Sequence, residues 1–311
     1  MKKLSRRAFT KAVLATPILA TFGQVANADE PKENEVGTAG NINGFYFGWT
    51  PDLPYYQSRS LTAPAEALRK LPESASIRDK MPEVYDQKRL GSCTANAVAA
   101  AVQYLRKKNN KGPEFIPSRL FIYYNGRVLE DKVPLDTGLQ VRHAVKALHE
   151  FGTCPEEQWP YDSPPGDPKT RVFPDGARAA TRPSQDIYSG SYEHRSLYDF
   201  GVKQDLDQLR ALLANGFPFL FGFTVYKSYF DSVTGQPLTK FKKPDRAEEP
   251  TPDGHCVLAV GYDNKEQHFV CRNSWGPNVQ DKGYFYMPYD IITDNTLATG
   301  FYTIEYINAV M

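Results

Sequence analysis

Hydrophobic residues recur with a helical period in the first half of the chain and in strand-like runs in the second half. Apolar positions spaced by three and four residues predict helices at about 93–107, 118–130 and 138–150. One more helix is predicted at about 203–214, closed by Gly216. Runs rich in aromatic and β-branched residues predict strands at 217–225, 255–262, 268–272, 283–287 and 301–307. The pattern therefore predicts an α+β protein that is helical first and β-rich later.

Three segments lack a sustained period. Residues 29–75 are rich in glycine, proline and aromatic residues, which predicts an irregular N-terminal extension. The Pro-rich, polar stretch 160–198 is expected to be a long loop joining two lobes, with strand fragments at best. The interval 226–253 contains four prolines and is interpreted as a loop within the β-rich half.

Residues 1–28 have the features of an export signal. The sequence Ser5-Arg6-Arg7-Ala8-Phe9-Thr10-Lys11 precedes a short apolar run and then Ala26-Asn27-Ala28. It resembles a twin-arginine signal, with Thr10 where leucine is usual. An apolar run this short, broken by Pro17, is poor for spanning about 30 Å of hydrocarbon, so we expect no stable membrane insertion after cleavage. The resemblance implies the twin-arginine export machinery as a partner and a periplasmic or secreted protein.

Charge and cysteine usage exclude several classes. Removing residues 1–28 changes the net charge from +1 to −4, because that segment carries five basic and no acidic residues. No basic stripe remains to indicate nucleic acid binding. The four cysteines are too few and too scattered for a disulfide scaffold, and no Cys-x-x-Cys pair indicates zinc. We expect neither a metal nor a cofactor.

One cysteine occupies a distinctive position. In Gly91-Ser92-Cys93, followed by TANAVAAA, small loop residues lead into an alanine-rich helix. The Cys93 thiol then lies at the positive end of the helix dipole, which favours the reactive thiolate. The alternative is that Cys93 is a small buried packing residue, as most free cysteines are.

A cysteine nucleophile needs a base, a group that orients the base and donors for an oxyanion. His255 opens an apolar strand, whereas His143, His149, His194 and His268 lie in helix, coil or a solvated strand end. The strands before and after the polar turn 263–267 would pair and bring Asn273 beside His255. Asn273 could then accept the imidazole N–H, with Trp275 shielding that bond. Gln87, six residues before Cys93, could donate to the oxyanion.

Together these blocks resemble the papain-like cysteine peptidases of the bacterial branch. The blocks are Gln87 ahead of Gly91-Ser92-Cys93, Gly254-His255 with Val260-Gly261-Tyr262, and Asn273-Ser274-Trp275-Gly276 with Gly283-Tyr284. The resemblance covers about residues 74–307. It implies a papain-like domain over 76–311, in which a cleft separates a helical left lobe at about 86–160 from an antiparallel β-barrel-like right lobe at about 199–307.

The resemblance also implies roles and a substrate class. Cys93 would be the nucleophile, His255 the base and acid, Asn273 the orienting group and Gln87 the oxyanion donor. The substrate would be a peptide or protein. The family usually has Cys-Gly-Ser-Cys-Trp, whereas this chain has Leu90 and Thr94 at the outer positions, so a family disulfide is absent. The long spacing from Cys93 to His255 predicts insertions within 160–198 and 226–253.

Two other functions share this scaffold. A thiol transferase or transpeptidase would use the same triad while excluding water, and the sequence leaves that open. A non-catalytic peptide-binding protein would usually have lost the nucleophile or the base, whereas all four positions are intact here. The aromatic residues of 217–224 would either line the cleft or fill the core of the β lobe.

Two further expectations concern the cysteines and the extension. Side-chain alternation predicts that Cys256 and Cys271 point apart and form no disulfide. Residues 29–75 show no helical period, so we expect no detachable helical inhibitory domain. Within them, Trp49 and Leu53 are expected to pack on the lobe surface. The opposing interpretation runs Tyr55-Tyr56 and neighbours through the cleft, so that the extension must be removed for activity.

Overall fold

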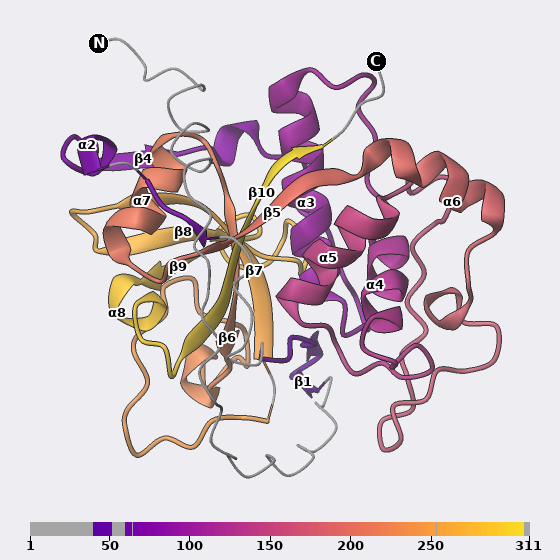
Figure 1. Cartoon of the computed structure of the whole chain (residues 1–311). Helices are drawn as coiled ribbons and strands as arrows, with labels where there is room; N and C mark the ends of the chain where they lie inside the picture. The colour runs from indigo at the N-terminus through magenta and orange to yellow at the C-terminus, as the bar shows by residue number, and fades with distance from the viewer. Residues whose placement is uncertain (1–39, 52–59, 64, 253, 308–311) are drawn as a thin grey trace, which may run out of the picture.

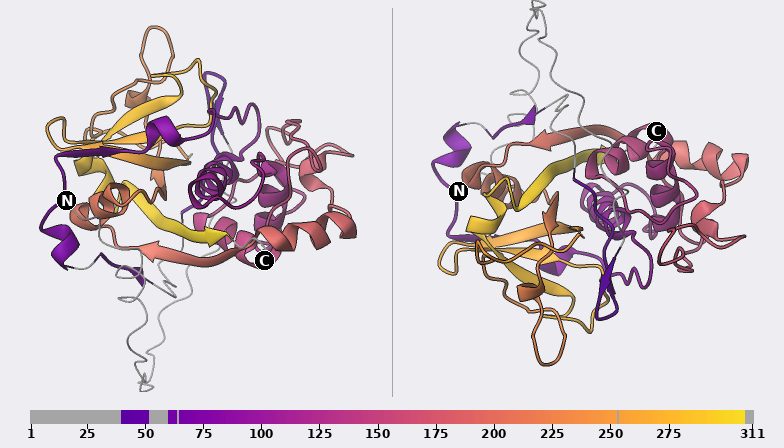
Figure 2. Two further views of the ribbon diagram at one scale, coloured as in Figure 1. Left: turned by 90° about the horizontal axis from the view of Figure 1, so that it is seen from above. Right: turned by 90° about the horizontal axis from the view of Figure 1, so that it is seen from below.

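A computed structural model describes residues 40–51, 60–63, 65–252 and 254–307. Helices gather on one side of the molecule and a twisted sheet on the other, as Figures 1 and 2 show. This is the two-lobed α+β arrangement of the papain fold. In the described part of the chain, no helix is long and apolar enough to cross a membrane.

The helical lobe is built around α3, Cys93–Asn109. Packed against it are α4 (Arg119–Val128) and α5 (Val141–Phe151), and α6 (Gln185–Ser191) packs on α4 through Tyr188 and Phe121. Alanine favours helix along α3, and Asn110 ends it in the left-handed conformation at φ 55°. The Ser118 side chain caps α4 by accepting from the Phe121 N–H at 3.1 Å. These helices confirm the three predicted in the first half.

The β lobe is one mainly antiparallel sheet with the strand order β3-β5-β10-β6-β7-β8-β9, and β4 pairs with β7. Its strands are β3 (Ser60–Leu61), β4 (Ser74–Ser76), β5 (Ser196–Val202), β6 (Phe219–Thr224), β7 (Gly254–Asp263), β8 (His268–Arg272), β9 (Tyr284–Pro288) and β10 (Ala298–Ile307). The helices α2 (Ala65–Leu68), α7 (Leu206–Ala214) and α8 (Tyr289–Ile292) accompany it. The five predicted strands and the helix before them are confirmed.

Two predictions for the connecting segments are wrong. Residues 160–198 were expected to hold strand fragments at best, but they contain α6, which Ser184 caps by accepting from the Ile187 N–H. A strand was also missed, because β5 precedes the predicted helix. Its alternation is weak in sequence, and pairing with β10 supplies its order.

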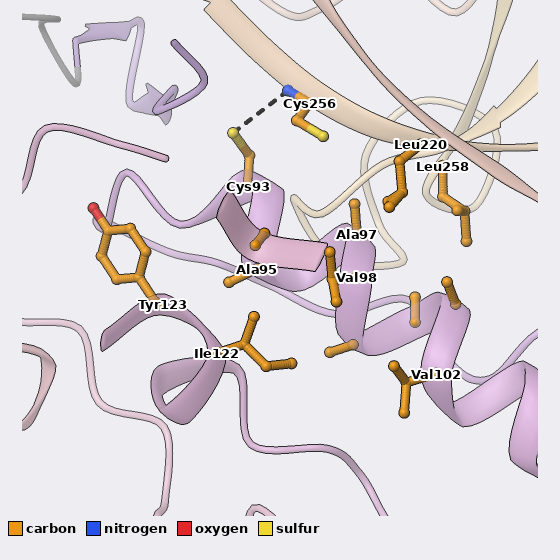
Figure 3. Close-up of a cluster of buried hydrophobic side chains, with 14 of the residues drawn as sticks. Cys93, Ala95, Ala97, Val98, Val102, Ile122, Tyr123, Leu220, Cys256 and Leu258 are labelled. Atoms are coloured by element: carbon orange, nitrogen blue, oxygen red, sulfur yellow. Dashed lines mark hydrogen bonds between the residues drawn. The ribbon is translucent and has the colours of Figure 1, made fainter. Parts of the chain in front are cut away.

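Two hydrophobic cores lie on the two faces of the sheet. One lies between α3 and the sheet and includes Val98, Leu220 and Leu258 (Figure 3). The other fills the β lobe with aromatic rings, including Phe219, Phe221 and Phe223. The aromatic residues of 217–224 are therefore core residues of the β lobe, which was the second of the two interpretations.

Candidate active site

Cys93 is the first residue of α3 and faces β7 across the junction of the two lobes (Figure 3). Its sulfur accepts the backbone N–H of Cys256 at 3.4 Å. The placement at a helix N-terminus is the one predicted. The side chain is nevertheless 0% exposed, so the thiol is covered rather than open to solvent.

His255 and Asn273 are brought together by the pairing of β7 with β8. The His255 Nε2 lies 2.8 Å from the Asn273 Oδ1. Asn273 is itself held, because its Nδ2 donates to the Gln280 Oε1 at 2.8 Å. Trp275 stacks on the imidazole with ring centroids 4.6 Å apart, which is the shielding position expected for it. Within the described part of the chain, the buried His255 Nδ1 has no hydrogen-bond partner.

Gln87 is oriented with its amide N–H groups toward the site. Its Oε1 accepts from the Ser274 hydroxyl at 2.6 Å. Its Nε2 donates to the Leu90 carbonyl at 2.9 Å and to the Tyr46 carbonyl at 3.1 Å. The Gln87 amide group is therefore already engaged by the Tyr46 carbonyl oxygen.

The site is covered by residues 40–51, which we call the strap. The strap begins as a hairpin of β1 (Asn41–Ile42) and β2 (Phe45–Tyr46). Its Tyr46 carbonyl also accepts from the Trp275 Nε1 at 3.2 Å. The Phe47 ring stands edge-on to His255 at 5.6 Å. The strap therefore closes the catalytic histidine candidate off from solvent.

Past His255, the strap backbone bridges the two lobes. On the β side the Trp49 N–H donates to the Gly254 carbonyl at 3.0 Å, and on the helical side the Leu139 N–H donates to the Gly48 carbonyl at 2.7 Å. A Cβ atom on Gly48 would lie 1.9 Å from the Gly91 oxygen. Because that neighbour is backbone, only glycine fits at this point of the strap.

One expectation for the extension is wrong. Trp49 was expected on a lobe surface, but it is only 5% exposed and lies between the lobes. The described part of the extension forms short strands held by backbone hydrogen bonds, and strands this short show no period in the sequence. Leu53, Tyr55 and Tyr56 lie outside the described residues.

Burial changes the protonation of both reactive groups. Removal from water raises the pKa of the Cys93 thiol to about 11. It lowers the pKa of His255 to about 4, although the bond to Asn273 opposes that shift. The helix dipole predicted a reactive thiolate, but burial under the strap outweighs it. Burial in the covered site therefore favours the neutral thiol and the neutral imidazole.

A buried carboxyl group, that of Asp136, holds the loop before Cys93, and no pattern in the sequence pointed to it. Asp136 accepts the Gly91 N–H at 3.0 Å and the Tyr123 hydroxyl at 2.6 Å. The same hydroxyl accepts the Gly138 N–H at 3.2 Å. Burial raises the pKa of Asp136, with the bond from Tyr123 opposing it. This network ties the loop before Cys93 to the 136–139 segment, in a protein that lacks the disulfide common in the resembled family.

All four cysteines are free thiols, which confirms that Cys256 and Cys271 are not bonded to each other. Cys256 packs in the core between α3 and the sheet, whereas Cys271 packs in the β-lobe core. The two side chains therefore lie on opposite faces of the sheet, as alternation predicts.

Comparisons with known proteins agree with this architecture. The sequence profile described as papain family cysteine protease matches residues 71–302. The structure of xylellain, a cysteine protease from Xylella fastidiosa, matches with 42% identity and a TM-score of 0.78, covering 85% of this chain and 96% of that one. An uncharacterized peptidase C1-like protein of Acanthamoeba polyphaga mimivirus is 35% identical over 71% of this chain and 68% of its own length. Digestive procathepsin L 3 of Tenebrio molitor, 18% identical with a TM-score of 0.57, covers 87% of this chain and 77% of that one and shares the fold.

Proposed function

Because this chain belongs to the papain family of cysteine proteases, we propose that it hydrolyses peptide bonds with Cys93 as nucleophile and His255 as base. Asn273 orients the imidazole, and Gln87 donates to the oxyanion. The observation that carries the proposal is the set of contacts joining His255 to Asn273 at 2.8 Å and Gln87 to a peptide carbonyl at 3.1 Å.

Each group has a defined step. His255 takes the Cys93 proton, and the thiolate sulfur bonds to the carbonyl carbon of the peptide. The negative charge on oxygen is then stabilised by the Gln87 amide and the Cys93 backbone N–H. The C–N bond breaks as His255 gives its proton to the leaving amine. Water, deprotonated by His255, hydrolyses the thioester and restores the Cys93 thiol.

Under this proposal, the protein is inactive while the strap is in place. The Tyr46 carbonyl of the strap accepts the Gln87 N–H that a substrate oxygen would need, and Phe47 covers the His255 imidazole. Burial also favours the neutral thiol over the thiolate. The strap must leave the cleft before a substrate can bind, whether by trimming of the extension or by reversible release.

Substitution of the reacting groups tests the proposal. Cys93→Ser and His255→Ala should each abolish turnover while the protein still folds, because the two groups act as a unit with effects of up to about 10⁶ in kcat. Gln87→Ala should lower kcat by about 10²–10³, the usual effect of one lost oxyanion donor. Substantial turnover in either triad variant would move the nucleophile or base elsewhere. An unchanged kcat in Gln87→Ala would remove that residue from the site.

Export through the twin-arginine machinery is proposed on the sequence of residues 1–28, which lie outside the described residues. A double Arg6→Lys, Arg7→Lys variant should accumulate inside the cell with its signal uncleaved, because the machinery recognises the paired arginines. Fractionation of a bacterial host measures this. An unchanged extracytoplasmic share of the variant would contradict this route.

A further inference from the structure

The Asn273 amide that holds His255 is itself held at both of its ends. Its Oδ1, which lies 2.8 Å from the His255 Nε2, also accepts the Ser274 N–H at 2.8 Å. Its Nδ2 donates to the Gln280 Oε1 at 2.8 Å. Asn273 is only 2% exposed, so these protein groups take the place of water as its partners. The orientation of the amide therefore depends on Gln280 as well as on the backbone of Ser274.

The Gln280 side chain is anchored to a group that cannot turn over. Its Nε2 donates to the Leu238 carbonyl at 2.9 Å. A main-chain carbonyl only accepts, so Gln280 has to present its nitrogen to Leu238 and its oxygen to Asn273. If the Asn273 amide turned over, its oxygen would face the oxygen of Gln280. The bonds from Leu238 through Gln280 therefore fix which end of the Asn273 amide faces the imidazole.

The Leu238 carbonyl is held in place by the backbone on either side of it. The Leu238 N–H donates to the Tyr229 carbonyl at 2.9 Å, and the Thr239 carbonyl accepts the Tyr286 N–H of β9 at 2.8 Å. Leu238 belongs to the 226–253 segment, in which the sequence predicts an insertion. That segment therefore supplies the fixed end of the chain of hydrogen bonds that reaches His255.

The backbone of Gln280 adopts a conformation that favours glycine. Its φ is 57°, in the left-handed region where a Cβ atom raises the energy of the chain. Other residue types persist in this region when their surroundings hold them there, and they cluster at functional sites. Glycine would suit the backbone at this position but could make neither of the two side-chain bonds. The amide of Gln280 is therefore what this position supplies.

We propose that Gln280 is a positioning residue that keeps the Asn273 oxygen on the Nε2–H of His255 and so leaves the Nδ1 free to take the Cys93 proton. A neutral imidazole with its proton on Nε2 accepts through Nδ1, and among the described residues the buried Nδ1 has no hydrogen-bond partner. With Asn273 turned over, its Nδ2 would face Nε2, the proton would move to Nδ1, and His255 could not act as the base. This inference rests on the proposed peptidase function and adds a residue to it.

Two variants remove the bonds of Gln280 in different ways. Gln280→Gly suits the backbone, and Gln280→Met keeps the length of the side chain. Both should lower kcat about tenfold, the lower end of the range for losing an outer hydrogen-bond partner of a functional histidine, because the Ser274 N–H still holds the Asn273 oxygen. KM should stay the same, since Gln280 acts through Asn273.

Turnover would be measured on the full chain after the strap has been freed. The chain would carry a recognition site for a highly specific protease between residues 52 and 59 and be cut there after folding. Gln267→Gly is the matched control, because Gln267 has a φ of 55° and its Nε2 also donates to a main-chain carbonyl, that of Asn264. Gln267 is exposed in the turn between β7 and β8, so its variant should keep the kcat of the unmodified chain.

Nitrogen NMR of the uncut chain, labelled with ¹⁵N-histidine, tests the orientation without any turnover. At pH 7 the His255 imidazole is neutral, because burial lowers its pKa to about 4, and the shifts of its two nitrogens report which one carries the proton. The His255 signals are those lost in His255→Gln. The unmodified chain and Gln267→Gly should show Nε2–H, and both Gln280 variants should show a share of Nδ1–H.

The two measurements separate the role of Gln280 from the peptidase function. An unchanged tautomer in both Gln280 variants, or a KM that rises while kcat stays the same, would overturn the inference. If the unmodified chain cleaved no peptide, the peptidase function would fail. A tautomer that still shifted in the Gln280 variants would then support the positioning of Asn273, whereas an unchanged tautomer would remove both.

Discussion

The two lobes hold the same site with different kinds of contact. On the helical side, two buried charged groups near the site are paired: Asp136 accepts the Gly91 N–H of the Cys93 loop, and the Arg119 guanidinium donates to Glu156 at 2.6 and 2.8 Å. In the β lobe, His255 is surrounded by rings, with Trp275 stacked on it and Phe47 and Phe223 edge-on. One side of the site therefore depends on satisfied hydrogen bonds and the other on packed volume.

This difference has a consequence for charge. Asp136 and Arg119 in the helical lobe each have hydrogen-bond partners. Among the described residues, Asn273 is the hydrogen-bond partner of the His255 Nε2, and the Nδ1 has none. The Cys93 loop is therefore fixed in position by a polar network, whereas burial among aromatic rings favours the neutral form of His255.

Loss of volume in the β lobe should have the largest effect on stability. Phe221 is fully buried and stacks on Phe301 with centroids 5.6 Å apart. Phe221→Ala should lower the free energy of unfolding by about 3–5 kcal/mol, through lost burial and the cavity left behind. Urea unfolding measures this. Phe221→Leu keeps most of the volume and should cost much less; equal losses in the two variants would show that packing is not what this lobe depends on.

Acid should weaken the folded protein through the aromatic cage. His255 has a pKa of about 4 in the fold, against 6.5 for an ordinary histidine. Between those values the unfolded chain binds a proton that the native chain does not, so stability falls as the pH falls from 6.5 toward 4. The neutral state of His255 in the fold therefore contributes about 3 kcal/mol to the free energy of unfolding above pH 6.5, and this contribution is lost as the pH falls toward 4.

Unfolding free energies at several pH values, in the wild type and in His255→Gln, measure that contribution. The variant cannot take up the proton and should lose less stability across the same window. Identical pH dependence of the two proteins would mean that His255 is not the group responsible.

Replacing a hydrogen-bond acceptor by a donor of the same size in the helical lobe should lower the free energy of unfolding by less than the loss of an aromatic ring does. Every partner that Asp136 has on Gly91, Tyr123 and Gly166 is a donor. Asp136→Asn turns one acceptor into a donor and should cost about 1–3 kcal/mol. It should also lower kcat more than it raises KM, because Gly91 lies two residues before Cys93, the proposed nucleophile. A drop in stability with unchanged kcat would limit Asp136 to a structural role.

Much of this could be predicted from the sequence where local pattern decides the structure. Alanine propensity placed Cys93 at the start of α3, and a five-residue polar turn was enough to pair β7 with β8 and bring Asn273 to His255. The strap could not be predicted, because its strands are two residues long and its contacts run through backbone atoms. In the sequence, Asp136 looks like an ordinary surface acid, because its three hydrogen-bond donors come from distant segments.

The strap covers the Cys93 thiol, and a substitution at Gly48 tests this directly. Gly48→Ala adds a methyl group whose position is 1.9 Å from the Gly91 oxygen, so the strap can no longer seat. The measurement is the rate at which iodoacetamide alkylates Cys93 at neutral pH, with the modified residue identified by mass spectrometry. We expect labelling at least about tenfold faster than in the unmodified chain, since a loss of about 1.4 kcal/mol of strap binding has that effect, and Gly190→Ala, where a Cβ meets nothing within 4 Å, should match the unmodified chain. Equal rates in all three proteins would contradict it.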